Sequence, residues 1–492
     1  MSQVRVRFAP SPTGYLHIGG LRTALYNYLL ARQTGGAFIL RIEDTDRTRF
    51  VADAEEDILS TLKWAGLDVD EGPEAGGDCG PYRQSERSEL YARHAAELVK
   101  SGAAYYAFDT PEELDALRER LKSPENPSPR CDCHTRGDLR NSLTLGDSET
   151  AALLAAGTPH VIRLLVEPGR TVSFVDAVRD QVSFASDVVD DQILVKSDGM
   201  PTYHLANVVD DHYMGITHVV RGEEWLSSTP KHILLYEALG WNAPTMVHLP
   251  LILSPTGGKL SKRAAERQGI PVLVKQYQEA GYEAEALINY IALLGWNPGD
   301  DRELFDMDGL VEAFSVERVG SAGVQFDLEK LRWFNGQHLR RLPVSNLADR
   351  TSVALASAGI KTDEAYVAEM VGLMQDRVAF ASELVTATGY FFSDPESYDE
   401  KGVKKRWKED SAELTESYAA ALEAGIDATP EAFEQTLREL TESREVGAGR
   451  LIHPARLAVS GVTMGPGLFE MMALLGPEAC ARRLRKAASV LG

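Results

Sequence analysis

The 492-residue sequence is poor in cysteine and has no long apolar run. Four cysteines in a chain of this length do not make a disulfide framework, which favours a reducing compartment. The best internal apolar run, residues 287–295, contains Asn289 and is far shorter than the ~18 residues of a membrane span. The first residues show no apolar core of a signal peptide. These absences argue against a secreted disulfide scaffold and a membrane protein, and they favour the cytoplasm.

Positive charge is also scarce, because 51 Lys and Arg face 73 Asp and Glu and give a formal net charge of −22. Proteins that coat nucleic acid non-specifically usually carry a basic field, so this balance counts against that class. A nucleic-acid partner is still allowed, since only the docking face has to be positive. The plainer explanation of the charge is solubility. At ~150 residues per domain, the length suggests about three domains.

The start of the chain has the pattern of a βαβ unit. Residues 4–9 alternate like a strand, residues 21–29 follow a helical period, and residues 37–42 form a second strand candidate. This order implies a parallel sheet with a ligand crevice at the carboxyl ends of the strands.

A similar rhythm returns after residue 190. Strand candidates are 192–196, 217–221 and 246–253, and helices are expected at 201–212 and from Pro230. We therefore expect a nucleotide-binding fold that is split by an insertion from about residue 83 to residue 199.

The first motif, residues 7–20, is a strand, a rigid turn and then His17-x-Gly19-Gly20 at the start of a helix. Glycines let a phosphate or a purine approach the backbone, and a helix N-terminus offers N–H groups and a positive dipole end. His17 could donate to a phosphate oxygen. His-x-Gly-Gly alone is most simply a strand-to-helix turn, but the whole string is far more specific.

The second motif, residues 257–263, reads Gly-Gly-Lys-Leu-Ser-Lys-Arg and follows the last strand candidate. Lys259, Lys262 and Arg263 can surround a triphosphate, and mobile cations lower the barrier to displacement at phosphorus. A solvated basic loop is the plainer explanation of the motif by itself. Its position after a split nucleotide fold favours the phosphate role.

Both motifs resemble the two signature sequences of class I aminoacyl-tRNA synthetases, usually written His-Ile-Gly-His and Lys-Met-Ser-Lys-Ser. Gly20 and Arg263 are variations typical of the glutamyl branch. The similarity continues through residues 38–46, 201–212, 221–226 and 326–331. Matches of this length and order, over about the first 340 residues, are more specific than a short motif.

The resemblance implies a class I synthetase fold: a Rossmann-like parallel α/β sheet, an inserted α/β domain and all-helical anticodon-binding domains. The expected boundaries are residues 1–82 and 200–245 for the catalytic domain, and 83–199 for the inserted tRNA acceptor-binding domain. Residues 246–338 are the expected stem-contact domain with the second motif, and residues 339–492 the anticodon-binding region, with a joint near residue 388.

The resemblance also implies the chemistry. The α-carboxylate of L-glutamate attacks the α-phosphorus of ATP, and the terminal adenosine of tRNA(Glu) then accepts the glutamyl group. Mg²⁺ would help to neutralise the phosphates. A monomer is expected.

Several alternatives remain open. Within the family they are a glutaminyl-tRNA synthetase, an enzyme that also charges tRNA(Gln), and the truncated paralogue that glutamylates a modified tRNA base. Residues 340–492 read as helical, whereas glutaminyl enzymes have a β-barrel there. Outside it they are a non-catalytic binding module and an adenylyl transferase for a small metabolite.

Free glutamate has two carboxylates and one ammonium group, so its site needs cations and an anion. Arg7 and Arg221, at strand ends, suit bidentate carboxylate contacts, and Glu43 suits the ammonium group. Tyr203 and Asn207 are four apart and share a helix face. Each charged residue alone is more often a surface or capping residue.

By resemblance, the amino-acid and ATP pocket consists of Arg7, Ala9, Ser11, Glu43, Tyr203, Asn207, Arg221 and Glu224. The residues assigned to ATP and catalysis are Pro10, His17, Gly19, Gly20, Lys259, Ser261 and Lys262.

Cys131-x-Cys133-His134 resembles half of a zinc site. Structural zinc usually takes four ligands. Some members of the family supply a second Cys-x-Cys upstream, but the matching residues 105–108 contain no cysteine. We therefore expect no structural zinc and assign no metal ligand.

The helical C-terminal region is expected to contact the anticodon. Its candidate basic stretches are residues 404–408 and 482–486, and Trp407 could stack on a base. A solvated helix face with a buried Trp is an equally good interpretation. The tRNA candidates are Arg377, Lys405 and Arg406. Arg377 resembles an arginine that in some relatives distinguishes C from U at the third anticodon base.

Overall fold

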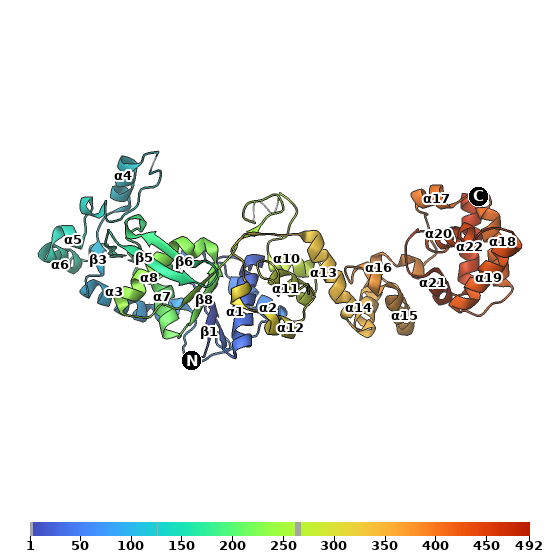
Figure 1. Cartoon of the computed structure of the whole chain (residues 1–492), viewed down its shortest axis with the longest axis horizontal. Coiled ribbons are helices and arrows are strands. Elements are labelled where there is room, and N and C mark those ends of the chain that lie inside the picture. Colours follow the sequence, from blue (N-terminus) through green and yellow to red (C-terminus); the bar gives the residue numbers. More distant parts are fainter. Residues whose placement is uncertain (1–2, 125, 261–266) are drawn as a thin grey trace. The chain divides into compact units, whose positions relative to one another are not determined.

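The computed structural model describes residues 3–124, 126–260 and 267–492 (Figure 1). It divides into two compact units: Met1–Glu279 with Leu287–Leu328, and Ala280–Ala286 with Glu329–Gly492. No helix among the described residues has the length and hydropathy needed to cross a membrane.

The first unit begins with the expected βαβ element. Strand β1 (Arg5–Phe8) pairs in parallel with β2 (Ala37–Leu40), and helix α1 (Ile18–Thr34) connects them. The helix stops at Gly35, whose φ of 62° lies in the left-handed region that glycine adopts readily. Helix α2 (Ala54–Trp64) follows β2. This part of the sequence prediction is confirmed.

The second half of the parallel fold follows the insertion. Helix α7 (Tyr203–Tyr213) leads to β8 (His218–Gly222), and α8 (Thr229–Leu239) connects β8 to β9 (Thr245–Leu249). β8 and β9 run parallel. The backbone N–H of Thr217 donates to the carbonyl of Arg5 at 2.9 Å, so the start of β8 lies beside β1. The carboxyl ends of β1, β2 and β8 therefore meet at one edge.

The inserted segment has a sheet of its own and also extends the catalytic one. Strands β3 (Ala104–Ala107), β4 (Val161–Leu164) and β7 (Ile193–Val195) form an antiparallel sheet. The hairpin of β5 (Thr171–Asp176) and β6 (Asp180–Ala185) instead joins β9, which gives the mixed order β6-β5-β9-β8. Its helices are α3 (Ser88–Lys100), α4 (Pro111–Leu121), α5 (Ser142–Leu145) and α6 (Asp147–Ala155).

One cluster of buried residues joins the inserted segment to the parallel fold of this unit. It includes Tyr91 of α3, Leu164 of β4, Val208 of α7 and Met246 of β9. The insertion is thus packed into the catalytic fold. The unit also contains β10 (Ile252–Leu253) paired in parallel with β11 (Val324–Gln325), and the helices α10 (Val274–Glu279) and α12 (Met307–Ala313).

The second unit is built from helices, and no strand lies among its described residues. After α11 (Ala284–Ala292), which ends in the first unit, its helices are α13 (Leu328–Arg341), α14 (Val344–Ser357), α15 (Glu364–Met374), α16 (Glu383–Thr386), α17 (Glu400–Arg406), α18 (Ser411–Glu423), α19 (Pro430–Ser443), α20 (Gly449–Ser460), α21 (Leu468–Leu475) and α22 (Pro477–Leu491). Their buried faces share one apolar core. The prediction of a helical C-terminal region is confirmed.

Candidate active site

A cavity of about 510 Å³ opens at the edge where β1 and β8 end. It is lined by the segment after β1, the start of α1, the first turns of α7, and the end of β8. The predicted residues that line it are Arg7, Ala9, Pro10, Ser11, His17, Gly19, Gly20, Glu43, Tyr203, Asn207, Arg221, Glu224 and Lys259. Ser261 and Lys262 lie outside the described residues.

Backbone hydrogen bonds continue beyond β1 and β2 and hold two cavity segments together. The N–H of Arg41 donates to the carbonyl of Phe8 at 3.0 Å, and the N–H of Glu43 donates to that of Pro10 at 2.9 Å. Pro10 has no N–H of its own, so its carbonyl is the group that can fix this turn. The pairing brings Glu43 next to Ser11 and Arg7 although more than thirty residues separate them in the sequence.

His17 is the N-cap of α1, and its Nδ1 accepts a hydrogen bond from the N–H of Gly20 at 2.9 Å. A neutral imidazole that accepts at Nδ1 carries its proton on Nε2, which is the tautomer suited to donation to a phosphate oxygen. The contact also occupies one of the helix N–H groups that could have bound phosphate directly. A Cβ at Gly20 would lie 2.7 Å from Cδ1 of Leu16, so a larger residue would displace that buried side chain.

Arg7 is held by a buried carboxylate. Its Nε and Nη2 donate to the two oxygens of Asp211 at 2.9 and 3.3 Å, and Asp211 also accepts from Nη1 of Arg41 at 2.7 Å. Burial works against ionisation of Asp211, yet Arg7 and Arg41 hold its pKa below the ordinary value. The guanidinium of Arg7 therefore has a fixed orientation where it lines the cavity.

Glu43 belongs to the same buried network. Its Oε1 accepts from Nη2 of Arg41 at 3.1 Å and from Nδ2 of Asn207 at 3.5 Å. Burial raises the pKa of Glu43 and outweighs the opposing charges of Arg41 and Arg7. A bound ammonium group would favour the ionised form, as required of a residue that binds an amino group.

Arg221 is held by neutral groups. Its Nε donates to Nε2 of His248 at 3.1 Å, and its Nη2 donates to the hydroxyl of Thr229 at 3.0 Å. Its Nη1 lies 3.1 Å from the hydroxyl of Tyr203 and 3.3 Å from Nδ1 of His232. Among the described residues, none of these partners is a carboxylate, so the positive charge of Arg221 is not balanced by direct contact.

The His248 ring is fixed from its other side. Its Nδ1 lies 2.5 Å from Oδ2 of Asp176, the last residue of β5. Because Nε2 accepts from Arg221, the proton of the neutral ring is on Nδ1 and is donated to Asp176. Burial lowers the pKa of His248, and Arg221 adds to this effect against Asp176. Burial and Arg221 also keep the pKa of His232 well below the ordinary value.

The remaining wall of the cavity is both aromatic and charged. The rings of Tyr203 and Trp225 are 4.6 Å apart. Lys259 donates to Oε1 of Glu224 at 3.1 Å. Burial would raise the pKa of Glu224, but its own backbone N–H and Lys259 hold it below the ordinary value. The cavity thus combines guanidinium groups, carboxylates and a helix N-terminus, which suits a small zwitterion with extra carboxylate together with a phosphorylated ligand.

Comparison with family models covers nearly the whole chain. Residues 3–333 match the catalytic domain of class I tRNA synthetases (E and Q), and residues 339–488 match an anticodon-binding domain. A "Glutamate–tRNA ligase" of Porphyromonas gingivalis is 48% identical and aligns with 100% of this chain and 99% of its own length. One of Chloroherpeton thalassium is 46% identical, over 99% and 98% of the two chains.

The chain belongs to the glutamate–tRNA ligase family.

A solved structure agrees with this membership. The crystal structure of a glutamate tRNA ligase from Elizabethkingia meningosepticum, in complex with its amino acid, matches with a TM-score of 0.94 at 42% identity. The match covers 100% of both chains. The predicted fold class, with an α/β catalytic part and a helical anticodon-binding region, is confirmed.

Two of the predicted tRNA-contact residues, Arg377 and Arg406, lie near side chains of α20. Arg377 ends a short 3-10 helix (Gln375–Arg377), and Lys405 and Arg406 are in the last turn of α17. Burial lowers the pKa of His453 on α20, and the charge of Arg406 lowers it further. Arg377 acts in the same way on Arg456, also on α20, whose pKa is lowered mainly by burial. The basic residues of α20 are scattered along the helix, so they form no basic run in the sequence.

The second basic stretch, residues 482–486, is not the free basic surface that the sequence suggested. Arg482 and Arg483 both bind Asp394, and Arg485 pairs with Glu423. Lys486 donates to the carbonyl of Pro395. These cations fasten α22 to the rest of the unit. Trp407 is half-buried and packs against the apolar core, so the interpretation of a buried Trp is met only in part.

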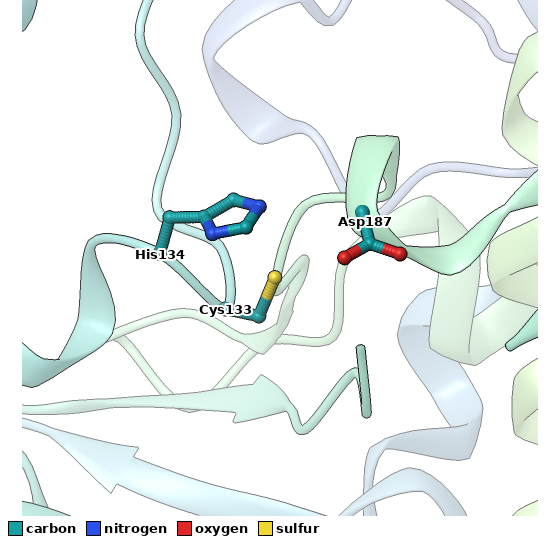
Figure 2. Close-up of side chains that lie close together, drawn as sticks. All are labelled: Cys133, His134 and Asp187. Atoms are coloured by element: carbon teal, nitrogen blue, oxygen red, sulfur yellow. The ribbon is translucent and has the colours of Figure 1, made fainter. Parts of the chain in front are cut away.

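The structure separates the cysteines that the sequence pairs. Sγ of Cys131 lies 3.6 Å from the hydroxyl of Tyr105. Cys133 and His134 instead lie near Asp187, with their potential ligand atoms within 4.8 Å of one another (Figure 2). Other members of the described chain form no group of three or more such ligands.

Proposed function

We propose that this chain activates L-glutamate with ATP and transfers the glutamyl group to the terminal adenosine of tRNA(Glu). Membership of the glutamate–tRNA ligase family supports the reaction. The observation that carries the proposal for this chain is the cavity in which Arg7, Arg221 and Glu43 meet beside the start of α1. Two cations and one anion match the two carboxylates and the ammonium group of glutamate.

In this proposal the glutamate subsite is made by residues whose own positions are fixed. Arg7 and Arg221 bind the two carboxylates, and Glu43 with Asn207 receives the ammonium group. Tyr203, Ser11, Ala9 and Glu224 complete the wall. Because the partners of both arginines hold them in place, little conformational entropy is lost when glutamate binds.

ATP, as its Mg²⁺ complex, takes the part of the cavity next to the helix N-terminus. His17 donates through Nε2 to a phosphate oxygen, and Pro10, Gly19 and Gly20 allow close approach of the nucleotide. Lys259 and Lys262, with Ser261, hold the phosphates as the carboxylate attacks the α-phosphorus. Charge that accumulates on the leaving pyrophosphate is stabilised by these cations.

The domain roles follow the family. Residues 83–199 contact the acceptor end, residues 246–338 contact the stem, and residues 339–492 contact the anticodon, with Arg377, Lys405 and Arg406 as contact residues. The enzyme is a monomer in the cytoplasm. The proposal includes no four-ligand structural zinc, because residues 105–108 contain no cysteine that could complete the set.

Charging assays test this function directly. Purified protein is given labelled glutamate or glutamine with tRNA(Glu) or tRNA(Gln). We expect glutamyl transfer to tRNA(Glu) and no transfer of glutamine. Glutamyl transfer to tRNA(Gln) would identify a non-discriminating enzyme, whereas preferential use of glutamine would refute the proposal.

Lys262→Ala tests the transition-state role of the second motif. We expect glutamate-dependent pyrophosphate exchange, measured with tRNA present, to fall about 10²–10³-fold with a much smaller change in the KM for ATP. Lys100→Ala, at an exposed lysine on α3, is the control and should leave exchange unchanged. An unchanged exchange rate in Lys262→Ala would refute this role.

A further inference from the structure

Cys133, His134 and Asp187 gather on the inserted domain, away from the cavity described above. Cys133 and His134 belong to the loop between α4 and a short 3-10 helix (Arg136–Asp138), whereas Asp187 lies in another short 3-10 helix (Ser186–Val188) after β6. Figure 2 shows the thiol between the imidazole and the carboxylate. One thiol, one imidazole and one carboxylate are the three side-chain types that zinc accepts in proteins.

The two segments that carry these side chains are already fastened to each other. The N–H of Asp191 donates to the carbonyl of Cys131 at 2.8 Å. Nη1 of Arg136 lies 3.1 Å from the Asp191 carboxylate and 2.9 Å from the carbonyl of Val166. Both flanks of the cluster are therefore held by buried or half-buried polar contacts. A site on such a framework needs little backbone reorganisation to bind an ion.

The three side chains are also oriented and available. The N–H of Gly169 donates to Oδ2 of Asp187 at 3.0 Å, which fixes that carboxylate. The N–H of His134 donates to Oδ1 of Asp132 at 2.9 Å, which sets the turn that presents the ring. Within the described chain, the Cys133 thiol and the His134 ring have no hydrogen-bond partner of their own. Nothing in the protein therefore has to be displaced before they bind a cation.

The electrostatic surroundings favour a cation. The Cys133 thiol lies near the carboxylate of Asp187, and its neighbour in the sequence, Asp132, adds a second negative charge. Negative charge near a thiol disfavours the bare thiolate and would be relieved by a divalent ion. Cys131 is differently placed, since its thiol lies 3.6 Å from the hydroxyl of Tyr105.

We propose that Cys133, His134 and Asp187 form a three-residue site for a divalent transition-metal ion, with Zn²⁺ as the best match. A water molecule would complete the tetrahedron, as in other zinc sites with three protein ligands. Zinc–ligand bonds of about 2.0–2.3 Å place the atoms of a tetrahedral site roughly 3.5 Å apart. The ligand atoms now lie within 4.8 Å of one another, and His134 is exposed, so its ring has room to rotate towards the ion.

This site differs from the structural zinc that the sequence argues against. It uses one thiol of the Cys131-x-Cys133 pair and a carboxylate that is far away in the sequence, so no ligand count along one stretch could find it. Bound metal would tie the loop after α4 to the end of the β5–β6 hairpin. The inference does not depend on the reaction proposed for the cavity.

Cobalt is a suitable probe, because a Co²⁺–thiolate bond gives a charge-transfer absorption that zinc lacks. Full-length protein is treated with EDTA, desalted under reducing conditions and titrated with Co²⁺, and then with Zn²⁺ as competitor. We expect one equivalent of Co²⁺ to bind with a thiolate band, and Zn²⁺ to remove that band because zinc binds such sites more tightly than cobalt.

Variants assign the ligands. Cys133→Ser should abolish the thiolate band, and His134→Ala and Asp187→Asn should each weaken Co²⁺ binding at least about tenfold. Cys131→Ser is the matched control and should bind Co²⁺ like the unmodified chain. His134 is exposed, so its replacement leaves the fold intact even if Asp187→Asn disturbs the contact with Gly169.

Two results would overturn the proposal. The first is the absence of a thiolate band in the unmodified chain at micromolar Co²⁺. The second is loss of the band in Cys131→Ser with normal binding in Asp187→Asn, which would mean a different ligand set.

Discussion

Arg7, at the end of β1, and Arg221, at the end of β8, line the same cavity but have opposite kinds of partner. Arg7 pairs with the buried carboxylate of Asp211. Arg221 donates to imidazole and hydroxyl groups, among them His248 and Thr229. Both residues are almost fully buried, with 3% and 5% exposure, so solvent does not explain the difference.

The two arginines differ in whether a protein carboxylate balances their charge. The charge of Arg7 is balanced by Asp211, and this ion pair joins β1 to α7 and fixes the geometry of the guanidinium group before any ligand binds. The charge of Arg221 is not neutralised in this way, because neutral acceptors orient a cation and leave its charge in place. A buried cation without a counter-ion is costly in the empty protein, and a bound carboxylate would relieve that cost.

The largest effect is expected where charge balance is removed. Asp211→Asn takes the carboxylate away from Arg7 and Arg41, which stay buried. We expect the free energy of unfolding, from urea denaturation, to fall by about 3–5 kcal/mol.

Asp115→Asn is the control for this variant. It breaks an exposed ion pair with Arg118 in the same unit, and we expect it to leave stability nearly unchanged. Equal stability losses in the two variants would contradict the conclusion that Asp211 balances the buried charges of Arg7 and Arg41.

The next effect concerns the neutral partners of Arg221, which are His248, Thr229, Tyr203 and His232. Arg221→Lys keeps the positive charge, but a single ammonium group cannot donate to His248, Tyr203 and Thr229 at the same time. Loss of one charge-assisted contact to the substrate, about 1.5–3 kcal/mol, corresponds to a fall in kcat/KM for glutamate of roughly 10- to 100-fold.

The two arginines should also differ in how much their replacement lowers the free energy of unfolding. Arg7→Lys should lose both stability and kcat/KM, because Asp211 loses its two hydrogen bonds from Arg7. Arg221→Lys should change kcat/KM with a smaller loss of stability. If the two substitutions had the same pattern, the comparison between the two sites would fail.

A smaller effect is expected from Asp176, which acts on Arg221 through His248. Oδ1 of Asp176 accepts from the N–H groups of Val178 and Arg179 at 3.0 and 3.1 Å. In Asp176→Asn the amide oxygen takes that place, so the NH₂ group faces Nδ1 of His248 and moves the ring proton to Nε2. That proton would face the Nε–H of Arg221, so two donors would meet and the hydrogen bond between Arg221 and His248 would be lost. We expect the KM for glutamate to rise about tenfold with little change in kcat.

Rescue by a second substitution distinguishes this positioning role from a general structural one. His248→Gln can present its amide oxygen to Arg221, so Gln should leave the KM close to that of the unmodified enzyme. In the double variant with Asp176→Asn it should restore most of the lost affinity. An unchanged KM in Asp176→Asn alone would exclude the proposed role.

The partners of the two arginines mark the limit of prediction from sequence. The strand ends that carry Arg7 and Arg221, and the turn at His17, follow from local periodicity and from glycine and proline positions. Asp211 and Asp176 could not be found in this way. Asp176 reaches the site because β5 pairs with β9, a contact between segments some seventy residues apart without a local signal.

The basic run at residues 482–486 shows the opposite case, in which a pattern that is plain in the sequence is neutralised by contacts in the fold. Its charges form an obvious cluster in the sequence, yet Asp394, Glu416 and Glu423 bind them within the unit. Which charges remain available for a ligand depends on which carboxylates the fold brings to them. Composition alone cannot supply that information.

The smallest effect concerns pH. The pKa of His248 is lowered in the folded protein by burial and by Arg221, whereas in the unfolded chain it is near 6.5. Above pH 6.5 neither state is protonated, so His248 does not affect stability. As the pH falls below 6.5 the unfolded chain gains the proton first, and stability is lost until the folded pKa is reached. Between pH 7.5 and 5.5 we expect His248→Gln to lose less stability than the unmodified chain, by at most about 1 kcal/mol, measured by urea denaturation at each pH. Equal losses in the two proteins would mean that His248 takes up a proton as readily in the folded protein as in the unfolded chain, and the assignment of neutral partners to Arg221 would then be wrong.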